Sequence, residues 1–306
     1  MIPARTGTPI RVNPWLVLFF SLLAISTSGP LVRTSNADPL AIAVYRLGFS
    51  LVVVAIALGA TRTWRELRRI TPRELSIALG AGAMLALHFW SWNASIHLTT
   101  VAASVVLVNM HPPFVALLST FWLRERPRTI QWVGIAIAML GAAVVAASDA
   151  GSHSGVDSSR ALAGDGLALI GALTVAAYFV AGRRLRGAYG LWAYVALVYG
   201  AAFVVLVCIA GARGVPLVGY APRELLIFAA LAAGPMLIGH TGMNYALRYV
   251  PAYVVNLTVL GEPVGATALA FLLPNIREVP GLGTLVGGVV TIAGILAAAV
   301  GRGRRE

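Results

Sequence analysis

The sequence predicts an all-α integral membrane protein of about ten transmembrane helices, arranged as two inverted repeats of five. Three observations predict this class. Hydrophobic residues make up 58% of the chain and charged residues only 11%, whereas soluble domains average about 45–50% and about 25%. Uncharged or nearly uncharged stretches, each long enough to cross a bilayer, account for most of the 306 residues. Short motifs also recur, in the same order, about 150 residues apart.

The first half of the chain contains five predicted spans. The stretch Leu75–Leu123 has 49 residues without Asp, Glu, Lys or Arg, which is too long for one helix, so we expect two helices with a tight turn near His97–Val101. The other three spans are predicted at Val12–Val32, Pro39–Gly59 and Ile130–Ser148. The first of them resembles a signal peptide, but we expect an uncleaved helix because cleavage would break the repeat described below.

The second half contains five more predicted spans. They follow Asp149–Arg160, whose Ser, Gly and Asp content is typical of a linker. The spans are predicted at Gly166–Gly182, Gly190–Gly211, Leu225–Leu247, Pro251–Leu273 and Gly281–Val300. The predicted organisation is therefore a first repeat at residues 1–149, an extracytoplasmic linker at 150–163 and a second repeat at 164–306.

The placement of arginine predicts the orientation. All 23 basic residues are arginine, and when both termini lie on one side, 17 arginines fall on that side and five on the other. Cytoplasmic loops of membrane proteins carry the excess of positive charge, so both termini are expected in the cytoplasm. The net charge of +12 would suggest nucleic acid in a soluble protein, but here the lipid bilayer explains it and no nucleic-acid partner is expected.

The repeat is the most specific feature of the sequence. Thr71-Pro-Arg-Glu-Leu75 opens the third predicted span, and Ala221-Pro-Arg-Glu-Leu225 opens the eighth. Three further matches follow in order: Asn93 with Asn244, His111-Pro112 with Glu262-Pro263, and Gly134 and Gly141 with Gly287 and Gly294. Because five is odd, the second repeat enters the membrane from the opposite side. Inverted repeats of this kind are typical of secondary transporters, whose binding sites lie between the repeats near the midplane.

These features carry a resemblance to a known family. The chain resembles the drug/metabolite transporter superfamily, in particular its ten-helix members with EamA-type repeats. The resemblance rests on the doubled five-span unit, on the fourth predicted helix, which ends Phe121-Trp-Leu-Arg-Glu-Arg-Pro127, and on Gly261-Glu-Pro263 in the equivalent helix of the second repeat. The third span, with Leu87-His-Phe-Trp-Ser-Trp-Asn93, looks more particularly like that of bacterial aromatic amino-acid exporters. The chain departs from the family pattern in one respect, because its first repeat has His111-Pro112 in place of a Glu-Pro pair.

The third, sixth and eighth spans supply candidate substrate-binding residues. His88 and Trp92 are four residues apart and so share a helix face, with Ser91 beside it. They can offer a hydrogen bond and a stacking surface to an aromatic or ammonium-bearing solute, although Trp92 could instead belong to an interfacial aromatic belt. The second repeat contributes Thr174, Tyr178 and Phe179 from the sixth span as plausible cavity lining, and His240 from the eighth. Asn93 and Asn244 suggest a packing contact as readily as a ligand site.

Ionisable residues inside spans are costly and normally face the bundle interior. Arg46 is a candidate for binding a substrate carboxylate, with snorkelling or internal pairing as the structural alternative. Glu262-Pro263 and His111-Pro112 are candidates for gating or coupling, since proline removes a backbone hydrogen bond and breaks the helix locally. The alternative for Glu262 is a kink stabilised by one buried neutral acid.

The remaining motifs are interpreted as structural. The glycine pairs, with Gly283 and Gly287 in a small-residue motif, are expected to serve close helix packing or a homodimer face. Cys208 is the single cysteine, which excludes an intrachain disulfide and a multi-cysteine metal site. No Asp-rich or His-Glu-x-x-His motif is present, so we expect neither an enzyme nor a metal or other cofactor.

The predicted function is transport by alternating access through one cavity between the repeats. The resemblance implies amino acids as substrates, aromatic and other neutral ones, exported across the bacterial inner membrane. A phosphate-bearing substrate would demand several basic residues at mid-membrane, and Arg46 is the one basic residue inside a predicted span. Uptake, or efflux of drugs and other metabolites, remains an alternative.

Overall fold

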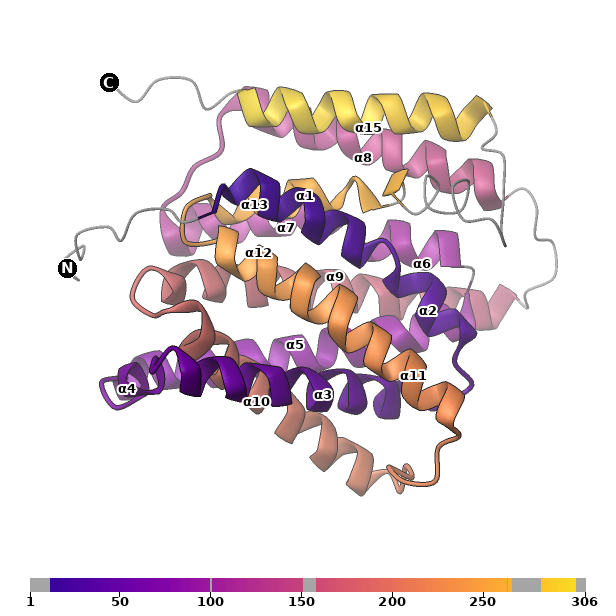
Figure 1. The fold of residues 1–306 in the computed structure, drawn as a ribbon. Coiled ribbons are helices and arrows are strands. Elements are labelled where there is room, and N and C mark those ends of the chain that lie inside the picture. Colours follow the sequence, from indigo (N-terminus) through magenta and orange to yellow (C-terminus); the bar gives the residue numbers. More distant parts are fainter. Residues whose placement is uncertain (1–11, 100, 151–157, 263, 266–281, 301–306) are drawn as a thin grey trace.

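The computed structural model describes residues 12–99, 101–150, 158–262, 264–265 and 282–300, and the regular elements among them are all helices (Figure 1). Within these residues, seven helices or consecutive helical runs are long and apolar enough to cross a membrane. Two shorter apolar helices, Thr129–Val144 and Leu285–Ala298, add to them. The predicted all-α, multi-span membrane class is confirmed.

The first repeat follows the predicted spans closely. Its elements are α1 (Pro14–Ile25), α2 (Ser28–Thr34), α3 (Pro39–Ala60), the short α4 (Trp64–Leu67), α5 (Pro72–Leu98), α6 (Val101–Val108), α7 (His111–Leu118), the π-helix η1 (Ser119–Leu123) and α8 (Thr129–Ala150). The expected turn between the third and fourth spans is present, because α5 ends at Leu98 and α6 begins at Val101. The first and fourth spans are each broken into shorter helices.

The second repeat begins inside the segment predicted as a linker. Its elements are α9 (Ser158–Arg186), α10 (Leu191–Ala212), α11 (Pro222–Leu231), the π-helix η2 (Ala232–His240), α12 (Thr241–Ala246), α13 (Ala252–Val259) and α15 (Leu282–Val300). The linker predicted at 150–163 is thus partly helical, since α8 includes Ala150 and α9 starts at Ser158. The predicted ninth span begins as α13, and most of its second half lies outside the described residues.

Proline and capping residues explain where several helices begin. The helices α1, α3, α5 and α11 all start with proline, whose missing N–H costs nothing in the first turn. Asn13 and Asp38 accept hydrogen bonds from the first turns of α1 and α3. Thr71 and Glu74 form a capping box at the start of α5. The spans are therefore delimited by ordinary helix-start signals rather than by hydropathy alone.

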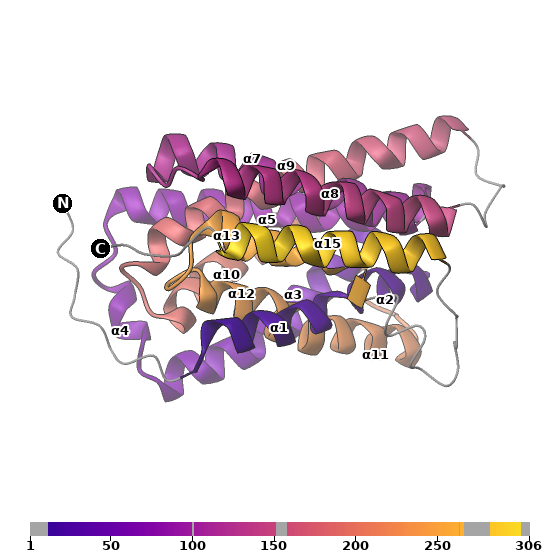
Figure 2. The same ribbon diagram turned by 90° about the horizontal axis from the view of Figure 1, so that it is seen from above.

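The helices pack in pairs that join one repeat to the other. The most extensive contacts are α8 with α15, α5 with α9 and with α10, α3 with α10, and α1 with η2 and α12 (Figures 1 and 2). When the two repeats are exchanged, the third span takes the place of the eighth and the sixth takes the place of the first. The α5–α9 pair therefore corresponds to the packing of α1 against η2 and α12. The same exchange leaves α3–α10 and α8–α15 unchanged, and α3 and α10 are both 22 residues long. The packing therefore has approximate two-fold symmetry.

The repeated Pro-Arg-Glu-Leu motif lies at both ends of the molecule. At the end where α4 lies in Figure 1, Tyr189 Oη donates to Glu74 Oε2 at 2.7 Å. Removal from water and this hydrogen bond raise the pKa of Tyr189 to about 12, so Tyr189 remains a neutral donor at physiological pH. Gly190 N donates to Glu66 Oε2 nearby at 2.6 Å.

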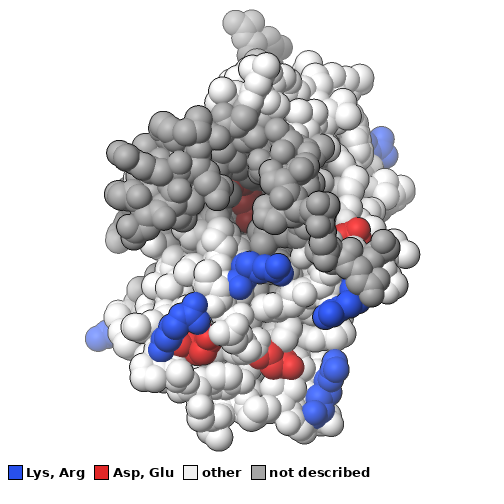
Figure 3. Space-filling model, turned by 90° about the vertical axis from the view of Figure 1, so that its right-hand side faces the viewer, with Lys and Arg blue, Asp and Glu red and all other residues white. Residues whose placement is uncertain are grey.

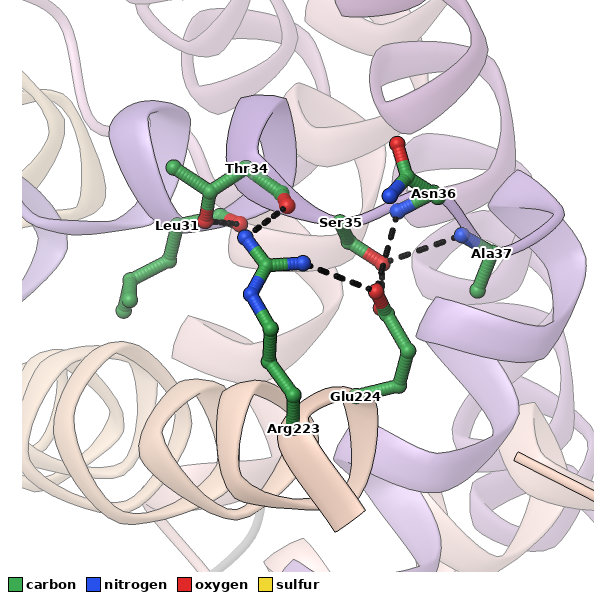
Figure 4. A network of polar contacts seen from close by, with 7 residues as sticks. All are labelled: Leu31, Thr34, Ser35, Asn36, Ala37, Arg223 and Glu224. Atoms are coloured by element: carbon green, nitrogen blue, oxygen red, sulfur yellow. Dashed lines mark hydrogen bonds and ion pairs between the residues drawn. The ribbon is translucent and has the colours of Figure 1, made fainter. Parts of the chain in front are cut away.

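At the opposite end, Glu224 occupies the equivalent place. Figure 4 shows Ser35, Asn36 and Arg223 converging on its carboxylate, with Ser35 Oγ to Oε2 at 2.5 Å and Asn36 N to Oε1 at 3.3 Å. Each motif glutamate thus binds the connection between the first two spans of the other repeat. Because equivalent residues lie at opposite ends, the two repeats are inverted.

The two ends of the molecule differ in the number of arginine side chains that they carry. Figure 3 shows the end on the right of Figure 1, where the arginine and acidic side chains lie scattered among uncharged residues. The loops predicted to be cytoplasmic lie at the other end and contact one another there. Arg183 pairs with Glu125 at 2.8 Å and donates to the carbonyl of Leu247 at 2.6 Å. These contacts join the loops after the fourth, sixth and eighth spans.

Glycines permit the close approach of α8 and α15, which lie side by side in Figure 2. A Cβ atom added at Gly134 or Gly294 would collide with backbone atoms of the other helix, and one at Gly141 would meet Thr291 and the carbonyl of Gly287. These glycines therefore serve close helix packing inside one chain. A homodimer through the Gly-rich helices, as the sequence suggests, would have to use their other faces.

Candidate functional site

A cavity of about 450 Å³, including the part open to solvent, lies between the two repeats. Seven of the predicted residues line it: Arg46, His88, Trp92, His111, Phe179, His240 and Glu262. Other lining residues were not predicted, among them Ser28 and Asn109. Polar groups from the first repeat and from the second therefore face one common space, as expected for a site between inverted repeats.

Among the described residues, four of those predicted do not line the cavity: Ser91, Pro112, Thr174 and Tyr178. Ser91 is fully buried and donates to the carbonyl of His88 at 3.3 Å. Tyr178 is also fully buried, and its hydroxyl accepts a hydrogen bond from Asn244 Nδ2 at 2.5 Å. Pro112 lies in the first turn of α7 and is buried. Pro263 lies outside the described residues.

The two asparagines of the repeat are packing residues. Asn244 donates to Tyr178, and Asn93 Nδ2 donates to the carbonyl of Pro39 at 3.2 Å. Both asparagine side chains are fully buried, and neither lines the cavity. Their hydrogen-bond partners lie at positions that do not correspond in the repeat.

Two broken helices meet at the cavity. The fourth span is interrupted at Asn109–Met110, between α6 and α7, and the ninth is interrupted at Leu260–Gly261, directly before Glu262. These breaks lie at equivalent positions of the two repeats. Asn109 Nδ2 donates to Glu262 Oε2 at 3.1 Å, so a hydrogen bond links the two breaks. Discontinuous helices at the repeat interface are typical of transporter binding sites.

Arg46 reaches the cavity from α3. Its guanidinium lies over the Phe89 ring, 4.2 Å from the centroid, and Nη1 donates to Ser28 Oγ at 3.3 Å. The side chain is 1% exposed, which excludes snorkelling to the membrane surface. Within the described part of the chain, no carboxylate lies within ion-pair distance of Arg46, and Nε has no hydrogen-bond partner.

Aromatic rings form one wall of the cavity. The His88 and Trp92 rings are nearly parallel, with centroids 6.2 Å apart, and Phe179 and His240 repeat this arrangement at 6.2 Å. His88 is fixed by a 3.0 Å hydrogen bond between Nδ1 and the carbonyl of Gly171. Trp92 is 5% exposed and thus belongs to the cavity rather than to an interfacial belt.

Several polar atoms around the cavity lack partners. Among the described residues, Trp92 Nε1, His111 Nε2, His240 Nδ1 and Arg46 Nε are buried without a hydrogen bond. Buried polar atoms in folded proteins are nearly always hydrogen-bonded. These atoms all belong to residues that line one space, so they are available to a polar ligand that enters it.

Asn109 and Ser28 line the cavity but were not predicted from the sequence. Asn109 corresponds to Leu260 in the second repeat, so comparison of the two halves shows no polar residue at the equivalent position. Ser28 lies at the start of α2, where the first span breaks, and a serine in an apolar stretch is unremarkable in sequence. Phe179 and its neighbour Tyr178 were both predicted, and the rotation of α9 about its axis places Phe179 at the cavity and Tyr178 outside it.

Comparisons with known proteins relate the chain to transporters. The model of the EamA-like transporter family matches the chain twice, at residues 13–147 and 162–300. The chain is 27% identical over 250 residues to "Uncharacterized transporter YdfC" of Bacillus subtilis, covering 81% of this chain and 78% of that protein. It is 29% identical over 260 residues to "Probable terminal-alkyne amino-acid exporter" of Streptantibioticus cattleyicolor, covering 82% and 80%.

The fold has a counterpart among solved structures. One crystal structure superposes with a TM-score of 0.76 at 20% sequence identity, covering 94% of this chain and 96% of that one. At this identity the likeness concerns the fold alone. The double match to the family model, together with a helical, multi-span structure, shows that the chain belongs to the EamA-like transporter family of the drug/metabolite transporter superfamily.

Proposed function

We propose that the protein exports amino acids, aromatic and other neutral ones, across the bacterial inner membrane by alternating access. One observation carries the proposal: Arg46 of the first repeat and Glu262 of the second line the same cavity without forming an ion pair. A zwitterion carries the complementary pair of charges, so that its carboxylate suits Arg46 and its ammonium group suits Glu262. The charges of the substrate then offset the free-energy cost of burying the Arg46 and Glu262 charges.

The surrounding groups support the same class of substrate. The parallel His88–Trp92 and Phe179–His240 rings offer faces against which an unsaturated or aromatic side chain can pack. The name of the Streptantibioticus relative, a probable exporter of an amino acid, supports both the substrate class and the outward direction. A lipophilic cation is disfavoured because the buried Arg46 would repel it within the cavity.

A panel of three ligands tests whether both charges are recognised. Phenylalanine should raise the melting temperature of the detergent-solubilised protein, because a ligand that binds the folded state stabilises it. Phenethylamine lacks the carboxylate and 3-phenylpropionate lacks the ammonium group, so each should need at least about tenfold more ligand for the same shift, as loss of one charged contact implies. Equal shifts with phenylalanine and phenethylamine would refute the role of Arg46.

The predicted orientation remains part of the proposal, with both termini in the cytoplasm. It can be tested with single cysteines, because Cys208 is the single cysteine of the chain and Cys208→Ser removes it. On intact cells, a membrane-impermeant maleimide should label Val218→Cys, at an 82% exposed position between α10 and α11, and should leave Arg69→Cys unlabelled until the cells are opened. Labelling of Arg69→Cys alone on intact cells would reverse the orientation.

A further inference from the structure

Asn109 is a buried polar residue that lines the cavity. Its side chain is 2% exposed and lies in the break between α6 and α7. Asn109 Nδ2 donates to Glu262 Oε2 at 3.1 Å, and both residues line the cavity. The bond therefore crosses from the first repeat to the second at the point where a helix of each is interrupted.

The Glu262 carboxylate depends on this bond. Within the described residues, Asn109 supplies the one side-chain hydrogen bond to it, because Ser26 Oγ contacts the backbone carbonyl of Glu262 rather than its carboxylate. Arg46 lies beyond ion-pair distance. A buried carboxylate without a donor is strongly unfavourable. Loss of Asn109 would thus either turn the carboxylate away from the cavity or change its protonation.

We propose that Asn109 is a positioning residue that holds the Glu262 carboxylate toward the cavity and shares it with the ammonium group of the substrate. The inference rests on the proposed function, since it assigns the ammonium group to Glu262. Asn109 Nδ2 engages Oε2, which leaves Oε1 for the substrate. The amide thus fixes the direction of the carboxylate without neutralising its charge, whereas a lysine or arginine at this position would compete with the substrate.

The variant Asn109→Asp tests the contact because it keeps the shape and makes the donor depend on pH. A protonated aspartic acid donates to Glu262 as the amide does, whereas an ionised one places two carboxylates at hydrogen-bond distance. Such a pair holds one proton and releases it as the pH rises. Arg46, His88, His111 and His240 face the same cavity, but they are common to the wild type and the variant. The difference between the two pH profiles therefore reports the new pair.

Two readouts are expected to agree. Efflux of phenylalanine from proteoliposomes by Asn109→Asp should approach the wild-type rate at low pH and fall, by up to about tenfold per pH unit, once the shared proton is lost. The melting temperature of Asn109→Asp in detergent should fall relative to the wild type over the same pH range. In the double variant Asn109→Asp/Glu262→Gln, the glutamine restores a neutral donor to the pair. The melting temperature of the double variant should therefore no longer fall with rising pH relative to the wild type. Asn109→Ala should reduce efflux at every pH.

The proposal is overturned when Asn109→Asp follows the wild type in both efflux and melting temperature at every pH. It is also overturned when the double variant keeps the pH dependence of the single variant, because Glu262 is then not the partner. Failure of the proposed function looks different, since the wild type itself would not transport phenylalanine. In that event the melting profiles still decide whether Asn109 positions Glu262.

Discussion

Replacing Arg46 with alanine is expected to raise the apparent KM for phenylalanine efflux about 10- to 100-fold. A charge-assisted hydrogen bond contributes about 1.5–3 kcal/mol, and each 1.4 kcal/mol corresponds to about a tenfold change in affinity. Arg46 lines the cavity with Nε free of partners among the described residues, and its contacts to Phe89 and Ser28 hold it in place without satisfying its charge. Initial efflux rates at increasing internal phenylalanine measure the change.

A second buried arginine provides the matched control. Arg186 is 2% exposed, but its guanidinium donates to the carbonyls of Asn244 and Tyr189, at 2.8 and 2.5 Å, outside the cavity. Arg46→Lys keeps the charge and loses the planar fork, so it should raise KM. Arg186→Lys should lower the melting temperature and leave KM unchanged. An unchanged KM in both Arg46 variants would exclude Arg46 from substrate recognition.

Gly294→Ala is expected to destabilise the protein by about 1–3 kcal/mol, the usual range for overpacking, and Gly294→Leu to prevent accumulation of folded protein. A Cβ atom at this position would overlap Ala138 N and the carbonyl of Gly134 on α8. These are backbone atoms, so no side-chain rotation relieves the overlap, and the helices α8 and α15 have to separate. The measurement is the melting temperature in detergent.

Gly200 provides the control for helix propensity. It lies inside α10, and a Cβ atom there would meet nothing within 4 Å. Gly200→Ala should stabilise the protein by about 0.5–1 kcal/mol, because alanine loses less conformational freedom in a helix than glycine does. A similar shift for Gly294→Ala and Gly200→Ala would mean that α8 and α15 do not pack closely in the membrane.

The class and the topology of the fold were predictable because they depend on composition and on recurrence. Hydropathy located α3 and α10 to within a residue at either end. The repeated Pro-Arg-Glu-Leu motif identified the third and eighth spans as equivalent. The structure places Glu74 and Glu224 at opposite ends of the molecule, as inverted repeats require. The start of α9 was missed because serine, aspartate and glycine near Ser158 favour a loop reading even where a helix forms.

The candidate site was predictable only in part. Charged residues in apolar spans have few permissible places, which is why Arg46 and Glu262 were identified and do line the cavity. The rotation of a helix about its axis is less constrained by the sequence, so Tyr178 and Phe179 were both candidates, and the structure places Phe179 at the cavity. Asn109 could not be found, because its importance comes from a contact between segments 153 residues apart.

We expect one solute to use the charges of both repeats at once, and efflux by the wild-type protein tests this most directly. Purified protein would be reconstituted into liposomes loaded with labelled phenylalanine, and efflux compared with that from protein-free liposomes. Threonine and methionine would be tested alongside. We predict faster efflux of phenylalanine with the protein than without it, and a marked loss of this difference in Arg46→Ala. Equal rates with and without protein for all three amino acids would contradict the assignment.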